Sequence, residues 1–312
     1  MKSKYRIRNW RQYNASLIQR GNITVWFSDN AMKNWKASIL QKRGRPFVYS
    51  DQAIMTALII RSVFHLSLRS VEGFLRSLCV FLAPELPVPS YTQICRRAAY
   101  LGQDLKKLSK KKITDIVIDS TGLKVYGEGE WKVRKHGASK RRTWRKLHLA
   151  VCPDSNEILF SLLTENSVSD CEIYKHFLAK APSSITKSYG DGAYDTSSCY
   201  RASFLHGSEL IVPPRRNAVY RENTPLHMKS RNEAILSICE SSCNEEGRKL
   251  WKILNGYHRR SLAETAMFRM KQLFGTNLRS REFCRQRAEV RARSESLNIM
   301  TRLGMPRGEW IT

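Results

Sequence analysis

Between residues 113 and 212 the chain alternates short β-branched apolar runs with a single amphipathic helix. Runs of four to seven such residues bounded by turn residues are typical of buried strands. The order strand, strand, strand, helix, strand predicts an α/β domain built on a mixed sheet. The predicted elements are strands at Ile113–Asp119, Leu147–Val151, Ile158–Leu163, Ile185–Tyr189 and Glu209–Val212, with a helix from the Ser169 cap to about Leu178.

A second strong element covers residues 257–271, which contain no Gly or Pro and are rich in helix-forming residues. Tyr257, Arg260, Glu264 and Lys271 are separated by three, four and seven residues, which places them on one stripe of a continuous helix. A solvated, salt-bridged helix face is the plain alternative for such a stripe. The stripe gains weight from two further carboxylates upstream.

Those carboxylates are Asp119 and Asp191, each expected at the tip of a strand and each followed closely by glycine. Each acid alone could simply cap a turn. Together with Glu264 they would place about three negative charges in one pocket, which a hard divalent cation stabilises. Two Mg²⁺ ions about 4 Å apart can activate an oxygen nucleophile and stabilise the leaving oxygen of a phosphodiester. Asp195 is a further acid nearby, and the prediction takes Asp191.

The charge balance points to a polyanionic partner, with 54 Lys and Arg against 27 Asp and Glu and a formal net charge of +27. Nucleic acid is the first such partner to consider. Basic residues with two interleaved tryptophans fill residues 124–146 and suit phosphate neutralisation, although a solvated hairpin is the alternative. The predicted DNA contacts are Tyr257, Arg260, Lys271, Lys132, Arg134, Lys135, Arg141, Arg142, Arg96 and Arg97.

Before this domain, capping serines at positions 50, 67 and 90 predict three helices over residues 51–101. They fit a helix-turn-helix whose last helix carries Arg96 and Arg97 toward DNA, and equally a plain three-helix packing unit. The segment Ile23–Phe27 reads as a short strand or apolar anchor. Arg43–Pro46 has the composition of a minor-groove arm, with a linker as the better interpretation.

Other features exclude several classes of protein. No apolar run is long enough to span a bilayer, and residues 1–10 lack the apolar core of a secretory signal. The eight cysteines show no zinc-ligand spacing and read as ordinary buried thiols. We therefore expect a reduced cytoplasmic protein.

The run Tyr257-x2-Arg260-x3-Glu264-x6-Lys271 resembles the signature of bacterial insertion-sequence DDE transposases. The segment Asp191-Gly-Ala-Tyr is similar to their second-aspartate region, and VIDSTGLKVYGEGEWKVRKHG around Asp119 to the first in the insertion-sequence five family, nine-zero-three-like branch. The resemblance implies an RNase H-like fold, a catalytic and metal-binding triad of Asp119, Asp191 and Glu264, and Mg²⁺, with Mn²⁺ as a substitute. It also implies that the N-terminal part binds terminal inverted repeats, and that the protein is bacterial and associated with the nucleoid.

We expect three regions: residues 1–110 as a helical DNA-binding domain, 111–275 as the catalytic domain with a small insertion at about 214–250, and 276–312 as a basic tail. The predicted function is a transposase that nicks double-stranded DNA at element ends and joins the 3′-OH to target DNA as a dimer or larger assembly. Two alternatives are a catalytically inactive DNA-binding repressor and a metal-dependent nuclease without strand transfer.

Overall fold

The computed structural model describes residues 4–37, 46–102, 112–125, 144–241 and 245–311. The chain divides into two compact units, and each is described by itself. Unit 1 combines residues 1–104 with residues 272–312, and unit 2 comprises residues 105–271. The second division falls within a helix, α12 (Ser261–Phe274).

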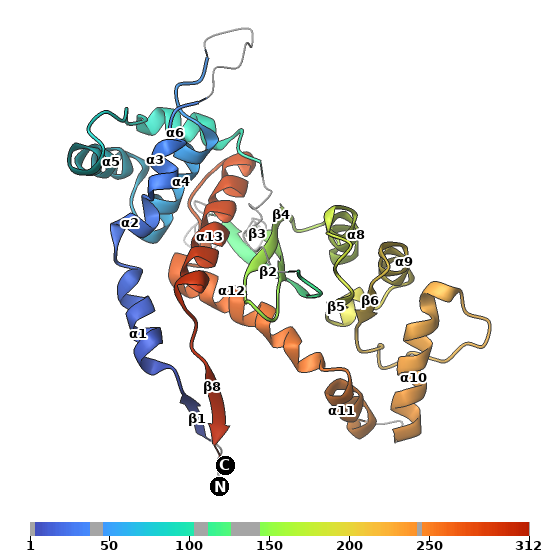
Figure 1. Ribbon diagram of the computed structural model, residues 1–312. Coiled ribbons are helices and arrows are strands. Elements are labelled where there is room, and N and C mark those ends of the chain that lie inside the picture. The colour runs from blue at the N-terminus through green and yellow to red at the C-terminus, as the bar shows by residue number, and fades with distance from the viewer. Residues whose placement is uncertain (1–3, 38–45, 103–111, 126–143, 242–244, 312) are drawn as a thin grey trace, which may run out of the picture. The chain divides into compact units, whose positions relative to one another are not determined.

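Unit 2 is built on a mixed sheet with strand order β4-β3-β2-β5-β6 (Figure 1). The antiparallel part joins β2 to β3 and β3 to β4, and the parallel part joins β2 to β5 and β5 to β6. This mixed α/β sheet is consistent with the predicted RNase H-like domain. The strands are β2 (Asp115–Val125), β3 (Trp144–Val151), β4 (Ile158–Glu165), β5 (Lys187–Tyr189) and β6 (Glu209–Ile211).

One face of this sheet is covered by α8 (Asp170–Lys180) and α9 (Ser197–His206), which lie side by side (Figure 1). Alternate residues of β2, Ile116 and Ile118, point into this core together with Tyr174 and Phe177 of α8. The helix starts as predicted, because the Ser169 side chain accepts a hydrogen bond from the Glu172 amide at 3.2 Å.

Strand β2 corrects one prediction about the site. We expected the strand to end at Asp119, because Ser-Thr-Gly follows it, but it continues to Val125 and places Asp119 in its interior. Pairing with β3 extends through Lys124 and Trp144 and overrides the local turn preference. Gly122 fits within the strand because the Trp144 ring lies over it, 3.0 Å from where a Cβ atom would stand.

Beyond β5 the chain forms a series of short and long helices. Residues 257–260 are a 3₁₀ turn, so the continuous helix predicted over 257–271 begins only at Ser261. These elements are η1 (Gly192–Tyr194), η2 (Leu226–Met228), α10 (Lys229–Ser241), α11 (Glu245–Leu254), η3 (Tyr257–Arg260) and α12.

Unit 1 is mainly helical, with a two-stranded antiparallel sheet between its first and last strands. The segment predicted as a strand or apolar anchor near Ile23 is instead a short helix, capped by the Asn22 side chain. The elements are β1 (Lys4–Ile7), α1 (Trp10–Gln19), α2 (Ile23–Trp26), α3 (Asp29–Lys33), α4 (Asp51–Val63), α5 (Leu68–Leu82), α6 (Tyr91–Ala98), β7 (Asn277–Leu278), α13 (Phe283–Leu303) and β8 (Gly308–Ile311).

The C-terminal region, which we expected to be a basic helical tail along DNA, folds mostly as the long helix α13, and this helix packs against α4 within unit 1. Its centre holds a buried ion pair, Arg293 Nη2 to Glu289 Oε1 at 2.7 Å. Glu289 also accepts the amides of Arg279 and Ser280, and Arg293 also donates to two backbone carbonyls. Both side chains of the pair therefore have further hydrogen-bond partners in the backbone.

Helices α4, α5 and α6 begin at the predicted serine caps and pack against one another. Among the described helices, none is by itself long and apolar enough to cross a membrane. Taken together, α4 and α5 have the length and apolar composition of a broken membrane span, with a bend of 110° between the two helices.

Candidate active site

Asp119 and Asp191 are brought together by the pairing of two parallel strands. Val117 of β2 is the register partner of Tyr189 of β5. Asp119 lies two residues beyond Val117, and Asp191 lies two residues beyond Tyr189. Adjacent parallel strands lie about 4.8 Å apart, so the register alone makes the two acids neighbours. Asp119 Oδ1 accepts the Ser120 amide at 2.8 Å, and Asp191 Oδ1 accepts the Ala193 amide at 2.9 Å.

Gly190, just before the second aspartate, is a junction for three segments. Its amide donates to the Ile211 carbonyl at 3.3 Å, and its carbonyl accepts the Tyr257 hydroxyl at 3.0 Å. A Cβ atom here would lie 2.8 Å from the Tyr194 ring, so only glycine fits without movement. The long segment between β6 and η3 therefore begins and ends beside Gly190, the residue that precedes Asp191.

Arg260 connects the sheet to the third carboxylate. Its Nη1 donates to Asp119 Oδ2 at 3.1 Å, and its Nη2 forms an ion pair with Glu264 Oε1 one turn further on. The Asp119 side chain is 14% exposed and that of Glu264 is 53% exposed. The guanidinium therefore lies between a largely buried acid and an open one.

Two further contacts hold η3 and α12 to the same strand. Arg259 Nη1 binds Asp115 Oδ2 at 2.6 Å, and Lys271 Nζ donates to Thr121 Oγ1 at 2.6 Å. Asp115, Asp119 and Thr121 alternate along β2 and so share one face. Lys271 was predicted from the sequence, whereas Arg259 and Asp115 were not, although the period-two pattern of the strand places Asp115 on the face of Asp119.

The electrostatics of the site reflect crowded acids. Burial raises the pKa of Asp119, and the nearby charges of Asp191 and Glu264 raise it further, against the lowering effects of the Ser120 amide and Arg260. Burial also raises the pKa of Tyr257 to about 12, so this hydroxyl is a neutral donor to Gly190. Ionised carboxylates here gain from any added positive charge.

Burial and the charges of Asp191 and Glu264 raise the pKa of Asp119, and three neighbouring carboxylates are a donor set of the kind that hard divalent cations bind. In the described part of the chain, however, no three His, Cys, Asp or Glu side chains are arranged to hold a metal ion. Arg260 supplies the positive charge between Asp119 and Glu264 instead. The chemistry of the three acids fits a cation, and the guanidinium lies between two of them.

The opposite face of the sheet carries a separate polar cluster around Asp170, at the start of α8. Lys146 Nζ lies 2.7 Å from Asp170 Oδ2, and His148 Nδ1 lies 3.3 Å from Oδ1. Burial would raise the pKa of Asp170, but hydrogen bonds from His148, Lys146 and Ser120 lower it strongly. Since Ser120 follows Asp119 directly, this cluster fixes β2 from behind the site.

Asp195, the competing acid, is engaged elsewhere. Its side chain is fully buried and pairs with Arg231 Nε at 2.7 Å, while Oδ2 accepts the Arg215 amide at 2.9 Å. These contacts attach α10 and the loop after β6 to the sheet domain. They leave Asp191 as the acid beside Asp119, and its role in the site stays a prediction.

The predicted DNA contacts fall into three groups. Lys132, Arg134, Lys135, Arg141, Arg142 and most of Arg43–Pro46 lie outside the described residues. Arg96 is exposed on α6, whereas Arg97 is buried and donates to the Tyr49 carbonyl at 2.7 Å and to Asp51 at 2.6 Å. Tyr257, Arg260 and Lys271 make the contacts within unit 2 described above. DNA contact by each of these residues stays a prediction.

Comparison with known protein families gives two matches, and both models are described as a transposase DDE domain. One covers residues 18–128 and the other residues 110–299. The second match spans more than half of the chain and contains all of the strands, helices and side chains that form the candidate site.

Proposed function

Because this chain belongs to the transposase DDE domain family, whose members are metal-dependent enzymes of DNA cleavage and transfer, we propose that it is the transposase of an insertion sequence. We place it in the insertion-sequence five family on the residues around Asp119. The observation that carries the assignment of the site is Arg260, which joins Asp119 to Glu264 while the β2–β5 register holds Asp191 beside Asp119.

We propose that Asp119, Asp191 and Glu264 hold the divalent cations, with Mg²⁺ as the physiological ion and Mn²⁺ as a substitute. Bound there, the cations would lower the pKa of an attacking oxygen and offset charge on the phosphate. The β2–β5 pair provides a rigid base for two of the ligands, and the exposed Glu264 is free to adjust.

The reaction consists of two phosphoryl transfers. In the first, a water oxygen attacks the phosphorus at the element end, the bond to the 3′ oxygen breaks, and a 3′-OH is released. In the second, that 3′ oxygen attacks a target phosphodiester and displaces a target 3′ oxygen. Two ends must be joined to one target, so we propose that the chain acts on double-stranded DNA as a dimer or larger assembly, bound to terminal inverted repeats.

Arg260 has a role of its own in this scheme. Its guanidinium faces two carboxylates and is only partly exposed, so it lies where the phosphate of a bound strand would approach. Its planar fork can contact a phosphate through two parallel hydrogen bonds. Lys271 and Arg259 bind Thr121 and Asp115 instead, and we assign them to holding α12 on β2.

The test is a joining assay with the full chain, a donor duplex carrying the element ends, a target plasmid and Mg²⁺. Asp119→Asn, Asp191→Asn and Glu264→Gln should each lower nicking and joining by about 10⁴-fold, because several kcal/mol of transition-state stabilisation is lost. Glu172→Gln, an exposed acid on α8, is the matched control and should retain full activity.

Three outcomes of this assay would contradict the proposal in different ways. Nicked donor without joined product would identify a nuclease. End binding without metal-dependent nicking by the wild-type chain would identify a repressor. If all three site variants join DNA as well as the wild type, the assignment of the active site is wrong.

A further inference from the structure

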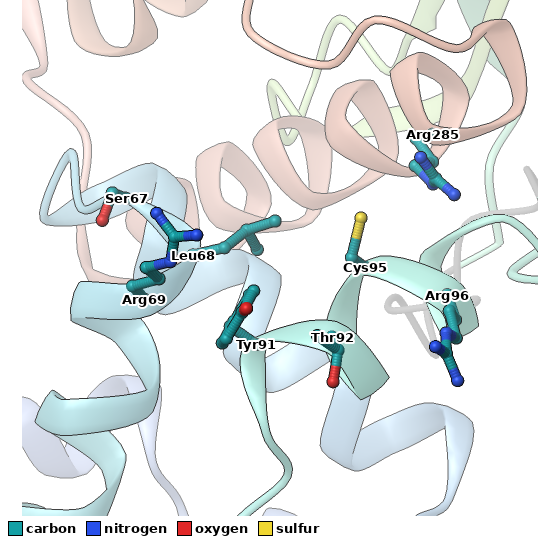
Figure 2. Close-up of a pocket in the computed structure, with 8 residues that line it drawn as sticks. All are labelled: Ser67, Leu68, Arg69, Tyr91, Thr92, Cys95, Arg96 and Arg285. Atoms are coloured by element: carbon teal, nitrogen blue, oxygen red, sulfur yellow. The ribbon is translucent and has the colours of Figure 1, made fainter.

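A groove in unit 1 combines an apolar floor with a cationic rim. It measures about 470 Å³ and is formed where the start of α5, the helix α6 and the first turn of α13 meet (Figure 2). Figure 2 shows that its walls come from three segments far apart in the sequence. The lining residues are Ser67, Leu68, Arg69, Tyr91, Thr92, Cys95, Arg96 and Arg285.

The cations of this groove are unusually available. Arg69 lies over the Tyr91 ring, 5.0 Å from its centroid, and Arg96 is exposed. Among the residues that the structure describes, neither of them has an acidic partner. A flat cation stacked on an aromatic ring keeps its in-plane N–H groups free to donate.

Arg285 adds a third cation to the groove, from the first turn of α13. Its Nη1 pairs with Glu282 at 2.9 Å, and its side chain is 28% exposed. A guanidinium carries five N–H groups, so this pairing leaves others that can donate to an anion.

The floor decides which anion fits. Leu68, the Tyr91 ring and the Cys95 thiol present apolar surface between the arginines. Free inorganic phosphate gains nothing from such a floor, whereas a nucleic-acid strand carries an apolar sugar between successive phosphates. The three arginines and the floor therefore match a sugar–phosphate chain, in which phosphates contact the rim and a deoxyribose packs on the floor.

We propose that this groove binds the DNA backbone and carries no base recognition. The inference rests on the proposed function only in taking DNA as the substrate. It revises the helix-turn-helix prediction, in which α6 carries both Arg96 and Arg97 toward DNA. Arg97 is buried against α4 and Tyr49. The side chains of α6 that line the groove are Tyr91, Thr92, Cys95 and Arg96.

The first experiment measures the salt dependence of duplex binding by the full chain. Arg69→Ala and Arg96→Ala should each reduce the slope of log K against log salt by about 1 and weaken binding about tenfold at 0.1 M salt. The loss should be equal for element-end and unrelated duplexes. Arg96→Lys should keep the slope. Arg76→Ala is the matched control, because Arg76 lies on α5 outside the groove and is paired with Glu72.

The second experiment needs no substitution. Cys95 lines the groove, whereas Cys239 is exposed in unit 2. Bound duplex should slow maleimide labelling of Cys95 more than tenfold, as read by peptide mass spectrometry, with Cys239 as the internal reference. A poly-glutamate peptide should give no such protection.

The inference is overturned if the wild type binds DNA while Arg69→Ala and Arg96→Ala leave the slope unchanged. It is also overturned if the loss is confined to element-end sequences, which would indicate base reading, or if the acidic peptide protects Cys95 and DNA does not. In each case the joining assay still reports separately on the proposed function.

Discussion

Two of the arginine–glutamate ion pairs in the described residues share a four-residue spacing in sequence but lie in opposite surroundings. Arg260 and Glu264 lie at the candidate active site, with side chains 23% and 53% exposed. Arg293 and Glu289 lie inside unit 1, with side chains 3% and 4% exposed. In the second pair the remaining polar atoms are satisfied by backbone groups, whereas in the first Arg260 is shared with another acid.

The difference distinguishes a buried pair that serves the fold from a pair that we propose to be functional. Glu289 accepts hydrogen bonds from Arg293 and from two backbone amides, so its charge is engaged within unit 1. Among the described residues, Glu264 pairs with Arg260 and keeps an open side, so we propose that it can exchange that partner for a ligand. Spacing alone describes both pairs equally well, and burial and the number of fixed partners distinguish them.

The largest expected effect contrasts the two glutamates directly. Glu289→Gln leaves Arg293 buried without its counter-charge and should lower the free energy of unfolding by about 3–5 kcal/mol. Glu264→Gln alters an exposed side chain and should change it by less than about 0.5 kcal/mol. Urea unfolding followed by circular dichroism measures both. Equal losses in the two variants would contradict the distinction.

The second effect concerns activity. Arg260→Ala removes a preorganised cation beside the reacting phosphate and should lower the joining rate by about 10²-fold. The joining rate of Arg260→Lys should fall between the rates of the wild type and Arg260→Ala, because an ammonium keeps the charge but cannot form the forked contact. Arg293→Lys serves as the comparison from the buried pair and should affect unfolding much more than the joining rate per folded molecule. An unchanged rate in Arg260→Ala would remove Arg260 from the mechanism.

The third effect is a dependence of stability on pH. Burial alone would raise the pKa of Glu289, but Arg293, the Arg279 amide and Arg61 outweigh it, and the pKa in the folded state is lowered. A lowered folded pKa means that the stabilisation is complete above the unfolded value of about 4.3 and is lost as pH falls below it.

The stability difference between the wild type and Glu289→Gln should therefore stay constant above about pH 5 and shrink below about pH 4.3, by at most about 1.4 kcal/mol per pH unit. Urea midpoints at several pH values measure it. A difference that grew on acidification would show that the pair is not ionised in the folded protein.

The smallest effect tests the attachment of η3. Tyr257→Phe removes the hydrogen bond to the Gly190 carbonyl, which is worth about 1 kcal/mol, and should slow joining about fivefold. Because the pKa of Tyr257 is raised to about 12, the ratio of wild-type to variant rates should not change between pH 6 and 9. A ratio that varied over this range would indicate that the hydroxyl takes part in proton transfer.

Many elements of both units could be predicted because their signals are local. The serine caps at positions 50, 67, 90 and 169 each begin a helix, and β4, β5 and β6 fall within two residues of their expected bounds. Strand β2 was underestimated, since its second half is held by pairing with β3 through residues whose local preference is for a turn.

Asp119 and Asp191 could be predicted as site residues because each follows an apolar run, but the side-chain contacts of the site could not be predicted. Arg260 was placed on the stripe of Glu264, yet its bond to Asp119 depends on tertiary packing across 141 residues of chain. The burial of Arg97 was also out of reach, because an arginine in a short basic helix reads as exposed until Tyr49 and Asp51 are seen beside it.

The junction at Gly190 has a consequence for how such chains diversify. The backbone departs at Ile211 and comes back at Tyr257, and both ends are hydrogen-bonded to the same residue, Ile211 to the Gly190 amide and Tyr257 to the Gly190 carbonyl. An inserted segment whose two ends lie close together can be lengthened, shortened or replaced by an unrelated module at little entropic cost, since the entropy of loop closure changes slowly with loop length. The spacing of the acids in space is thereby independent of how many residues separate the second from the third.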